Sequence, residues 1–244
     1  MKLNIMNKYS INSIEELHKM FRAFRSHYPT GWWFRGQSDV AWDLLPKAGR
    51  KEYFLPDNRD LGRFKAWRDM AIAYSKDLPD NDWECLAIAQ HHGLATRLLD
   101  WTYNPLVAVY FAVKENFNKN GAVYCYDPSV FIQETKFDLY QKDVISVFGY
   151  NPRSVSPRIL NQGGIFTVHC PANTEIIIEK HVAWENHSNL AEITIAKEIK
   201  KEVLMHLDDY GINEVSLFPG LDALSIYQNW LTLDMVEAKK NKKL

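Results

Sequence analysis

The chain has 244 residues, of which 46% are hydrophobic and 24% are charged. These proportions are ordinary for a globular protein and exclude a disordered, collagen-like or coiled-coil chain. Lysine and arginine together number 29 against 30 for aspartate and glutamate, so no overall positive field would recruit nucleic acid. The length favours one domain, and no Pro/Gly/Ser-rich linker divides it.

The cysteines and the first residues of the chain indicate the cellular compartment that we expect. The three cysteines are too widely spaced for a disulfide framework or a zinc motif, and we interpret them as buried thiols in a reducing cytoplasm: Cys85, Cys125 and Cys170. Residues 1–5 lack the apolar core of a signal peptide, and no run of about 18 apolar residues exists. We therefore expect a cytoplasmic protein without a membrane partner and without structural zinc.

The first half of the chain predicts mainly helices. Ser13 and Glu16 form a capping box that opens a helix, which Pro29 and Gly31 end. A buried strand at 32–34 runs into Arg35, and an amphipathic helix over about 60–77 presents residues 64, 67, 71 and 74 on one face. A further helix begins at Asn81 with a second capping box and stops at 92–93, before a strand at 96–101.

Residues 104–105, Asn followed by Pro, predict the start of a helix that continues to 117. Strands are expected at 122–126, 164–169, 174–179 and 191–196, the last with one solvated face that carries Glu192 and Thr194. A helix over 198–210 should end at Gly211, and a final helix should follow residue 220 with residues 221, 224, 227 and 231 on one side. Residues 129–156 give no clear pattern. Helices in the first half and strands in the second indicate an α+β fold.

Several chemical signatures are absent from the sequence: a phosphate loop, a GxGxxG fingerprint, a GxSxG elbow and an HExxH motif. One dense polar stretch, residues 90–102, sits where a helix end runs into a strand, a place where folds put sites. Its histidines, His91 and His92, are read as acid/base groups or metal ligands, or as a capping and a packed side chain. Adjacent helical positions point about 100° apart, so the two do not readily share one metal ion.

The other members of this stretch also have two interpretations. Arg97 and Asp100 either bind a ligand or form structural ion pairs, with each other or with Arg35. Trp101 either stacks on a ring or belongs to the core. Arg35 follows three aromatic residues at a strand end, and its planar guanidinium suits phosphate groups. Gly36 beside it would allow a ligand to approach the backbone closely.

Four ordered motifs resemble the FRG domain family. Residues 34–37 read FRGQ, and residues 89–112 read AQHHGLATRLLDWTYNPLVAVYFA, close to the family's central motif. Pro157-Arg158-Ile159 with 162–167, and 217–222, resemble the two later motifs, so the likeness spans about 13–235. Ala95 and Gly220 depart from the usual Pro and Asp. The family is widespread in bacteria and phages and has no settled activity.

A weaker resemblance links the chain to the arginine–serine–glutamate ADP-ribosyltransferases. In these enzymes an aromatic-Arg-Gly strand end holds the NAD phosphates, and residues 34–36 are similar. Their second motif, a strand, a Ser/Thr turn and a helix, is similar to residues 99–112 around Thr102. Their third motif places a catalytic Glu before a later strand, where this chain has Gln162. Glu214 is the alternative carboxylate, since residues 213–218 predict the start of a strand.

These features lead to one set of expectations. The fold is a single α+β domain: a helical N-terminal half packed on a mixed, mainly antiparallel β core that resembles an ADP-ribosyltransferase. Residues 1–12 form an extension, 13–235 the FRG domain, and 236–244 a basic tail of Lys239, Lys240, Lys242 and Lys243.

The expected function is binding of NAD, as substrate, or of a related nucleotide, with ADP-ribosyl transfer or NAD hydrolysis left open, in phage–host conflict or as a toxin. We expect cofactor binding by Arg35, Gly36, Gln37, Arg97, Asp100, Trp101 and Thr102, and catalysis by Gln162, Glu214, His91 and His92. Two rivals remain. One is a non-catalytic module that recognises a protein or nucleic acid. The other is a metal-dependent nuclease built on His91, His92 and Asp100. We also expect the four motifs to converge in space.

Overall fold

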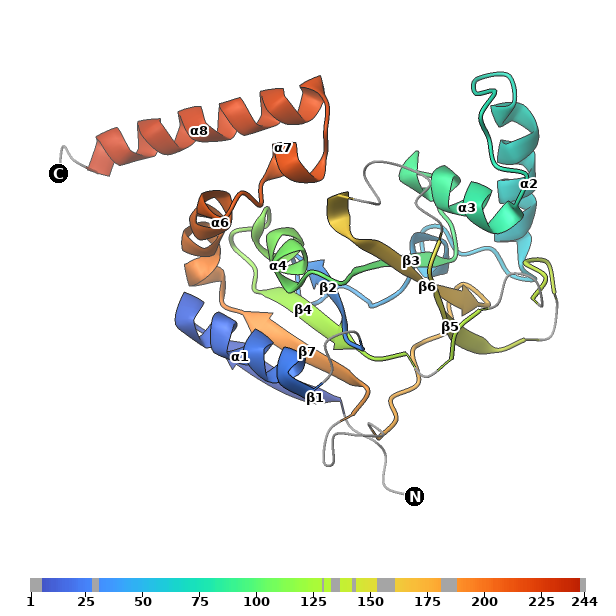
Figure 1. Ribbon diagram of the computed structural model, residues 1–244, viewed down its shortest axis with the longest axis horizontal. Coiled ribbons are helices and arrows are strands. Elements are labelled where there is room, and N and C mark those ends of the chain that lie inside the picture. The colour runs from blue at the N-terminus through green and yellow to red at the C-terminus, as the bar shows by residue number, and fades with distance from the viewer. Residues whose placement is uncertain are drawn as a thin grey trace.

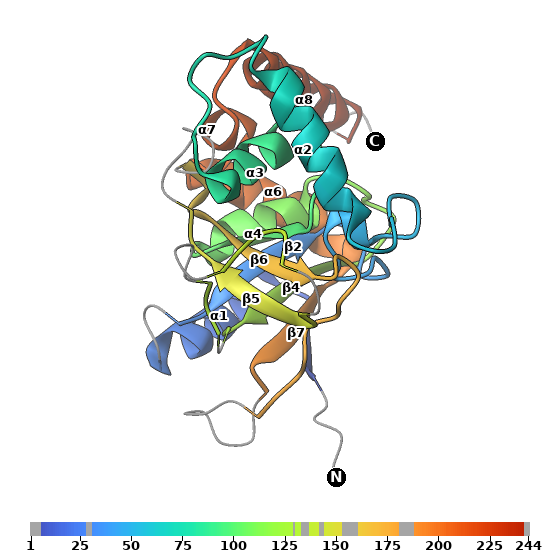
Figure 2. The same cartoon turned by 90° about the vertical axis from the view of Figure 1, so that its right-hand side faces the viewer.

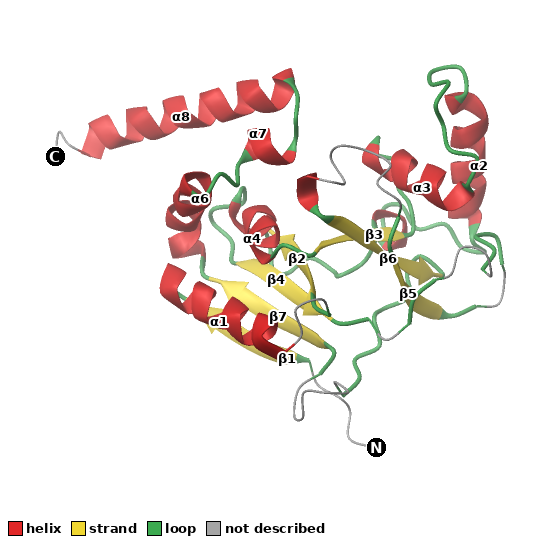
Figure 3. Cartoon of the chain, in the orientation of Figure 1, coloured by secondary structure: helices red, strands yellow, loops and turns green. Residues whose placement is uncertain are grey.

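The computed structural model of the chain contains one seven-stranded sheet covered by helices (Figures 1 and 3). It describes residues 6–27, 31–128, 130–132, 137–141, 144–152, 161–180 and 188–241. The strand order is β1-β7-β4-β2-β3-β6-β5. All neighbouring pairs are antiparallel except β1 with β7, so the expected mixed, mainly antiparallel sheet is confirmed. The strands are β1 Asn7–Ile11, β2 Trp33–Gln37, β3 Leu98–Thr102, β4 Gly121–Tyr126, β5 Ser146–Tyr150, β6 Gly164–Cys170 and β7 Leu190–Ile195.

Two groups of helices pack on this sheet, and their apolar faces form the core together with the strands. Residues of α1, α4 and α6 meet the β2-β4-β7 part of the sheet in one buried cluster, and residues of α2 and α3 meet β3, β5 and β6 in another (Figure 1). A view turned by 90° shows α2, α3, α4 and α8 on the side of the sheet away from the N-terminus (Figure 2). The helices are α1 Ile14–His27, α2 Arg59–Ala71, α3 Asp82–His91, α4 Pro105–Val113, α6 Lys200–Asp209, α7 Glu214–Leu217 and α8 Leu221–Asn241.

The helix boundaries follow the local signals in the sequence. The Ser13 hydroxyl accepts a hydrogen bond from the Glu16 amide at 3.3 Å, and the Asn81 side chain accepts one from the Trp83 amide at 2.8 Å. The side chain of Asn104 caps α4 in the same way. Gly93 and Gly211 end α3 and α6 with φ of +92° and +75°, a conformation that favours glycine. Each of these ends was predicted, because a cap depends only on neighbouring residues.

Other expectations were wrong. Helices dominate the first half, but strands do not dominate the second, because α6 to α8 lie there, and β1 to β3 come from the first half. The helix expected over 60–77 ends at Ala71, and Tyr74 is 91% exposed rather than on an apolar face. Residues 174–179 are not a strand, and residues 213–218 begin a short helix, α7. The helix expected to continue to 117 ends at 113.

The prediction of a solvated face on β7 was also wrong. Glu192 is only 6% exposed, on β7 between β1 and β4 in the sheet. The carboxylate is paired with Lys8 at 3.3 Å on the neighbouring strand. The polar position 192 in the alternating pattern of β7 therefore belongs to an ion pair between neighbouring strands and not to a solvent-exposed face.

The C-terminal helix α8 extends from the body of the molecule (Figure 1). Two members of its predicted apolar side are exposed, Leu221 at 80% and Leu224 at 43%. The helix reaches Asn241, so Lys239 lies on it, whereas Lys242 and Lys243 lie outside the described residues. Residues 153–160, which carry the Pro157-Arg158-Ile159 part of the third motif, also lie outside them.

Candidate functional site

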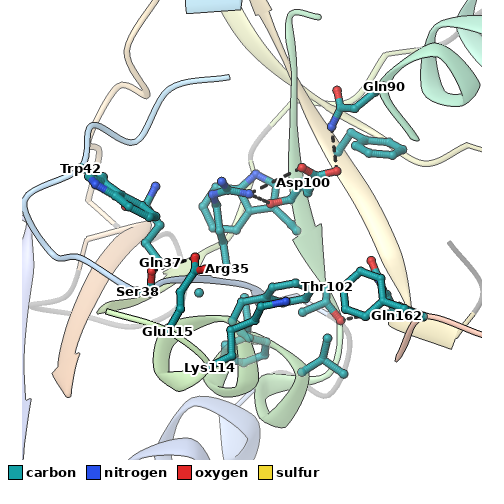
Figure 4. A pocket seen from close by; sticks show the side chains of 18 of the residues that line it. Arg35, Gln37, Ser38, Trp42, Gln90, Asp100, Thr102, Lys114, Glu115 and Gln162 are labelled. Atoms are coloured by element: carbon teal, nitrogen blue, oxygen red, sulfur yellow. Dashed lines mark hydrogen bonds and ion pairs between the residues drawn. The ribbon is translucent and has the colours of Figure 1, made fainter. Parts of the chain in front are cut away.

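A cleft of about 480 Å³ opens where β2 and β3 separate. In the described chain these strands pair at one position, Phe34 opposite Thr102, although β2 pairs along its full length with β4 and β3 with β6. The cleft is lined from β2, α3, β3, α4, the start of β6 and α7. Its lining includes Arg35, Gly36, Gln37, His91, Asp100, Thr102, Gln162 and Glu214, so the expected convergence of the motifs is confirmed for their described parts (Figure 4).

Arg35 bridges the separated strands. Its Nη1 donates to the backbone carbonyl of Asp100 at 2.8 Å, and the same nitrogen lies 3.8 Å from the Asp100 carboxylate. The Arg35 side chain is 14% exposed, whereas that of Asp100 is 64% exposed. Burial lowers the pKa of the Arg35 guanidinium from its usual value, and Asp100 opposes this shift. The buried Nε has no hydrogen-bond partner in the part of the chain that the structure describes. The guanidinium thus keeps one unused donor at Nε among the described residues.

Gln90 on α3 holds Asp100 in place. The Thr96 hydroxyl donates to Gln90 Oε1, which turns the Gln90 amide nitrogen toward the Asp100 carboxylate, 2.7 Å away. This chain of bonds orients the carboxylate beside Arg35 (Figure 4). The sequence placed Gln90 in the polar stretch without assigning it a role, since its partner could not be read from one-dimensional spacing.

Thr102 and Gln162 join two motifs at the other end of the cleft. The Thr102 hydroxyl donates to the backbone carbonyl of Gln162 and accepts from the Asn104 amide at 3.0 Å. The Gln162 side-chain nitrogen donates to the carbonyl of Leu217 at 3.2 Å. These bonds fasten the β3–α4 turn, the start of β6 and α7 together. Thr102 is 5% exposed and lines the cleft, and its hydroxyl secures the wall.

Glu214 supplies a carboxylate to the same wall. It accepts a short hydrogen bond from the Tyr110 hydroxyl, and Lys114 lies 3.5 Å from it. Burial, together with the bond to Glu214, raises the pKa of Tyr110 above its usual value. The Lys114 ammonium lies 4.9 Å from the centre of the Phe218 ring. The position of Glu214 comes from a helix capped by Asn213 and not from the strand that the sequence predicted.

Two of the predicted site residues lie outside the cleft, Arg97 and His92. Arg97 is 1% exposed and forms a two-pronged ion pair with Asp60, at 2.9 and 2.8 Å. It does not line the cleft, and its partner is neither Asp100 nor Arg35. His92 also lies outside the lining of the cleft, whereas His91 belongs to it.

Trp101 is 3% exposed, and its indole nitrogen donates to the Thr167 hydroxyl at 3.0 Å. Thr167 then gives its own proton to His169 Nε2, 3.0 Å away, so His169 Nδ1–H donates to the Thr174 carbonyl. Burial lowers the pKa of His169 to about 4, which keeps it neutral. The Trp101 indole is therefore mostly buried and held by Thr167, and the residue is also among those that line the cleft.

The glycine at position 36, which also lines the cleft, lets the backbone of α4 approach β2 closely. A Cβ on Gly36 would lie 1.8 Å from the Ala108 carbonyl oxygen and 2.7 Å from the Ala112 nitrogen. The close approach that the sequence predicted is real, but the backbone that approaches is that of the helix. It allows α4 to lie against β2 and bring Lys114 to the cleft.

The sequence missed several residues at the mouth of the cleft. Trp42, which is 43% exposed, lines it together with Ser38, Arg50, Lys114 and Glu115. No motif carries Trp42 or Arg50, because the loop that holds them is folded by backbone contacts. In the described ranges no group of three or more His, Cys, Asp or Glu is arranged to hold a metal ion. Nor does any described helix have the length and apolar character needed to cross a membrane.

Arg35 and the 89–112 stretch both lie in the part of the chain that matches a known protein family. Residues 30–121 match the FRG domain. The FRG domain resemblance inferred from the motifs is thereby confirmed, and the matched residues supply β2, α3, β3 and α4, which form most of the cleft. Gln162, Glu214 and Phe218 reach the cleft from outside the match. No curated protein and no solved structure matches the chain.

Proposed function

We propose that the cleft of this FRG-domain protein binds NAD or a closely related nucleotide, with Arg35 on the phosphates. The observation that carries the proposal is the Arg35 guanidinium, which is mostly buried at the cleft, holds one carbonyl and leaves Nε without a partner among the described residues. A guanidinium matches phosphate oxygens with its planar set of donors. The cleft volume of about 480 Å³ lies in the range of ligand sites.

The arrangement of the other side chains supports a dinucleotide in an extended pose. Arg35 lies between Trp42 and Ser38 on one side and Thr102 and Gln162 on the other (Figure 4). A pyrophosphate at Arg35 would place one nucleoside toward each end. The nicotinamide riboside goes to the Thr102 end, where Glu214 supplies the carboxylate. Gln90 and Arg35 both engage the Asp100 carboxylate beside this position.

The chemistry that this pose supports is cleavage of the bond between ribose C1′ and the nicotinamide nitrogen. The bonding electron pair passes to the pyridinium nitrogen, and neutral nicotinamide leaves. C1′ becomes cationic and then bonds to an oxygen of water or of a target side chain, which releases a proton. Glu214 would stabilise the positive charge at C1′ and hold a ribose hydroxyl. Gln162 at the third motif position offers hydrogen bonds without charge.

One observation favours a second candidate, nucleotide binding without cleavage. Lys114 lies 3.5 Å from Glu214 and Tyr110 donates to it, so the carboxylate is already partly satisfied. A carboxylate compensated in this way stabilises a neighbouring cation less. This candidate uses the same cleft and the same Arg35. A role in phage–host conflict or as a toxin stays a prediction from the family resemblance.

Two measurements on the purified protein test the proposal. Calorimetric titration with NAD should give saturable binding, and incubation with NAD followed by chromatography should show whether nicotinamide is released. Release that Glu214→Gln abolishes, with NAD binding kept, supports the cleaving form. Binding without release supports the second candidate. Absence of NAD binding in the unmodified protein refutes both. Glu202→Gln is the matched control, since Glu202 is exposed on α6 and does not line the cleft.

A further inference from the structure

The mouth of the cleft beyond Arg35 holds an unexplained buried acceptor. Gln37 is 2% exposed and lies two residues after Arg35 on β2, so both side chains leave the same face of the strand about 7 Å apart. Its amide nitrogen donates to the Asp43 carbonyl at 3.3 Å. A carbonyl only accepts, so this bond fixes the orientation of the amide. The Gln37 Oε1 atom is left buried with no hydrogen-bond partner in the described residues.

An aromatic side chain stands at the same end of the cleft. Trp42 lines the cleft and is 43% exposed. Its loop is held by backbone bonds from Val40 to Asn120 at 2.9 Å and from Trp42 to Asp39 at 3.2 Å. Gln37 ties the loop through Asp43. The indole is therefore presented by a fixed loop and offers a stacking surface.

The opposite wall at this end is fixed from behind by Lys200. Its ammonium is fully buried and donates to the carbonyls of Ser38 and Asn116 at 3.0 Å and of Glu115 at 2.6 Å. In front of it, the Ser38 hydroxyl donates to the Glu115 carboxylate at 3.2 Å. The wall thus presents acceptor oxygens held in place, and Gln37 Oε1 adds a further acceptor.

We propose that the Gln37–Trp42 end of the cleft is a base-recognition subsite that selects a heterocycle with an exocyclic amine, the adenine of the dinucleotide. Trp42 stacks on the ring, and Gln37 Oε1 accepts from the amino group. An oxo group at the same ring position would put its lone pairs against Oε1 and leave two acceptors unpaired. This inference rests on the proposed function, since it assumes that the phosphates lie on Arg35.

The test compares NAD with nicotinamide hypoxanthine dinucleotide, which differs from NAD by an oxo group in place of the adenine amine. In calorimetric titrations of the unmodified protein, the hypoxanthine analogue should bind at least about tenfold more weakly than NAD. This comparison needs no variant. Equal affinities would overturn the base-recognition subsite and leave NAD binding intact, whereas no binding of either dinucleotide would refute the proposed function itself.

Two variants then separate the roles of the residues. Gln37→Met keeps the length of the side chain and removes the acceptor. The affinity for NAD should therefore decrease, and the two dinucleotides should bind with similar affinities. Trp42→Ala should weaken both by a similar factor and keep their ratio, because stacking does not sense the amine. The aromatic control is Tyr74→Ala, since Tyr74 is 91% exposed and lies outside the cleft lining. If a folded Gln37→Met variant still bound NAD more tightly than the hypoxanthine analogue, the selectivity would come from another residue and the proposed role of Gln37 would be overturned.

Discussion

Arg35 and Arg97 are two mostly buried guanidinium groups with opposite surroundings, and replacing each by lysine separates ligand binding from stability. Arg97 donates from Nε and Nη2 to the two carboxylate oxygens of Asp60, and the two side chains are 1% and 6% exposed. Arg35 holds a backbone carbonyl and an exposed carboxylate, and its Nε has no described partner. Lysine keeps the charge in both places but loses the planar fork.

The structure sets the expected cost at Arg97. Lysine can keep one of the two charge-assisted bonds to Asp60, so Arg97→Lys should lower the free energy of unfolding by about 1.5–3 kcal/mol. Arg97→Ala leaves the Asp60 carboxylate buried without a counter-charge, which should cost about 3–5 kcal/mol. For a chain of this size, that larger loss corresponds to a decrease in melting temperature of about 6–20 °C.

The expectation at Arg35 is the reverse. Asp100 stays hydrated when Arg35 changes, because its side chain is 64% exposed, so Arg35→Lys should cost only about 1 kcal/mol of stability. Loss of the fork should weaken nucleotide binding by about 10- to 150-fold. Calorimetric titration with NAD and thermal denaturation followed by circular dichroism, applied to both lysine variants, measure the two quantities side by side.

A decrease in melting temperature for Arg35→Lys as large as that for Arg97→Lys, combined with unchanged nucleotide affinity, would refute this reasoning. Arg35 would then be a structural bridge between β2 and β3, and the cleft would serve something other than phosphate binding. If Arg97→Lys lost nucleotide affinity while it kept its melting temperature, the assignment of the two arginines would be reversed.

Further predictions concern the backbone, pH and metal. Gly36→Ala should lower the yield of folded protein or lower the free energy of unfolding by more than about 3 kcal/mol, since its Cβ would meet the Ala108 carbonyl. The control is Gly62→Ala in α2, whose Cβ meets no atom within 4 Å, so this variant should be neutral or stabilising. Equal stabilities of the two variants would contradict the packing of α4 on β2. The pKa of His169 in the folded state, about 4, lies below its unfolded value near 6.5, so the unfolded state takes up the proton first as pH falls. Stability should therefore decrease by about 3 kcal/mol between pH 6.5 and 4, and urea titrations of His169→Gln should lack that part of the decrease. Dialysis against EDTA should leave the melting temperature unchanged, and elemental analysis that finds stoichiometric zinc would contradict this expectation.

The sequence by itself determined the capped ends of several helices and the grouping of the motifs. The helix starts at Ser13, Asn81 and Asn104 were readable because the capping side chain and its amide partner are two or three residues apart. Arg35 and Thr102 came together as predicted, since their strands lie next to each other in the sheet. The FRG-domain motifs were specific enough to predict the family that residues 30–121 match.

Only the tertiary structure decided which partner each polar group takes. Asp60 pairs with Arg97 across 37 residues of sequence, and Lys200 reaches carbonyls 81 to 162 residues away. The buried Glu192 and the contact of Gly36 with α4 arise because another element happens to cover that face. Gln37 and Trp42 line the same cleft in the structure, where Gln37 holds the loop after β2 through its bond to the Asp43 carbonyl. Capping bonds and turn conformations depend on residues a few positions apart, whereas buried ion pairs and cleft walls depend on the packing of distant segments, which local sequence does not encode.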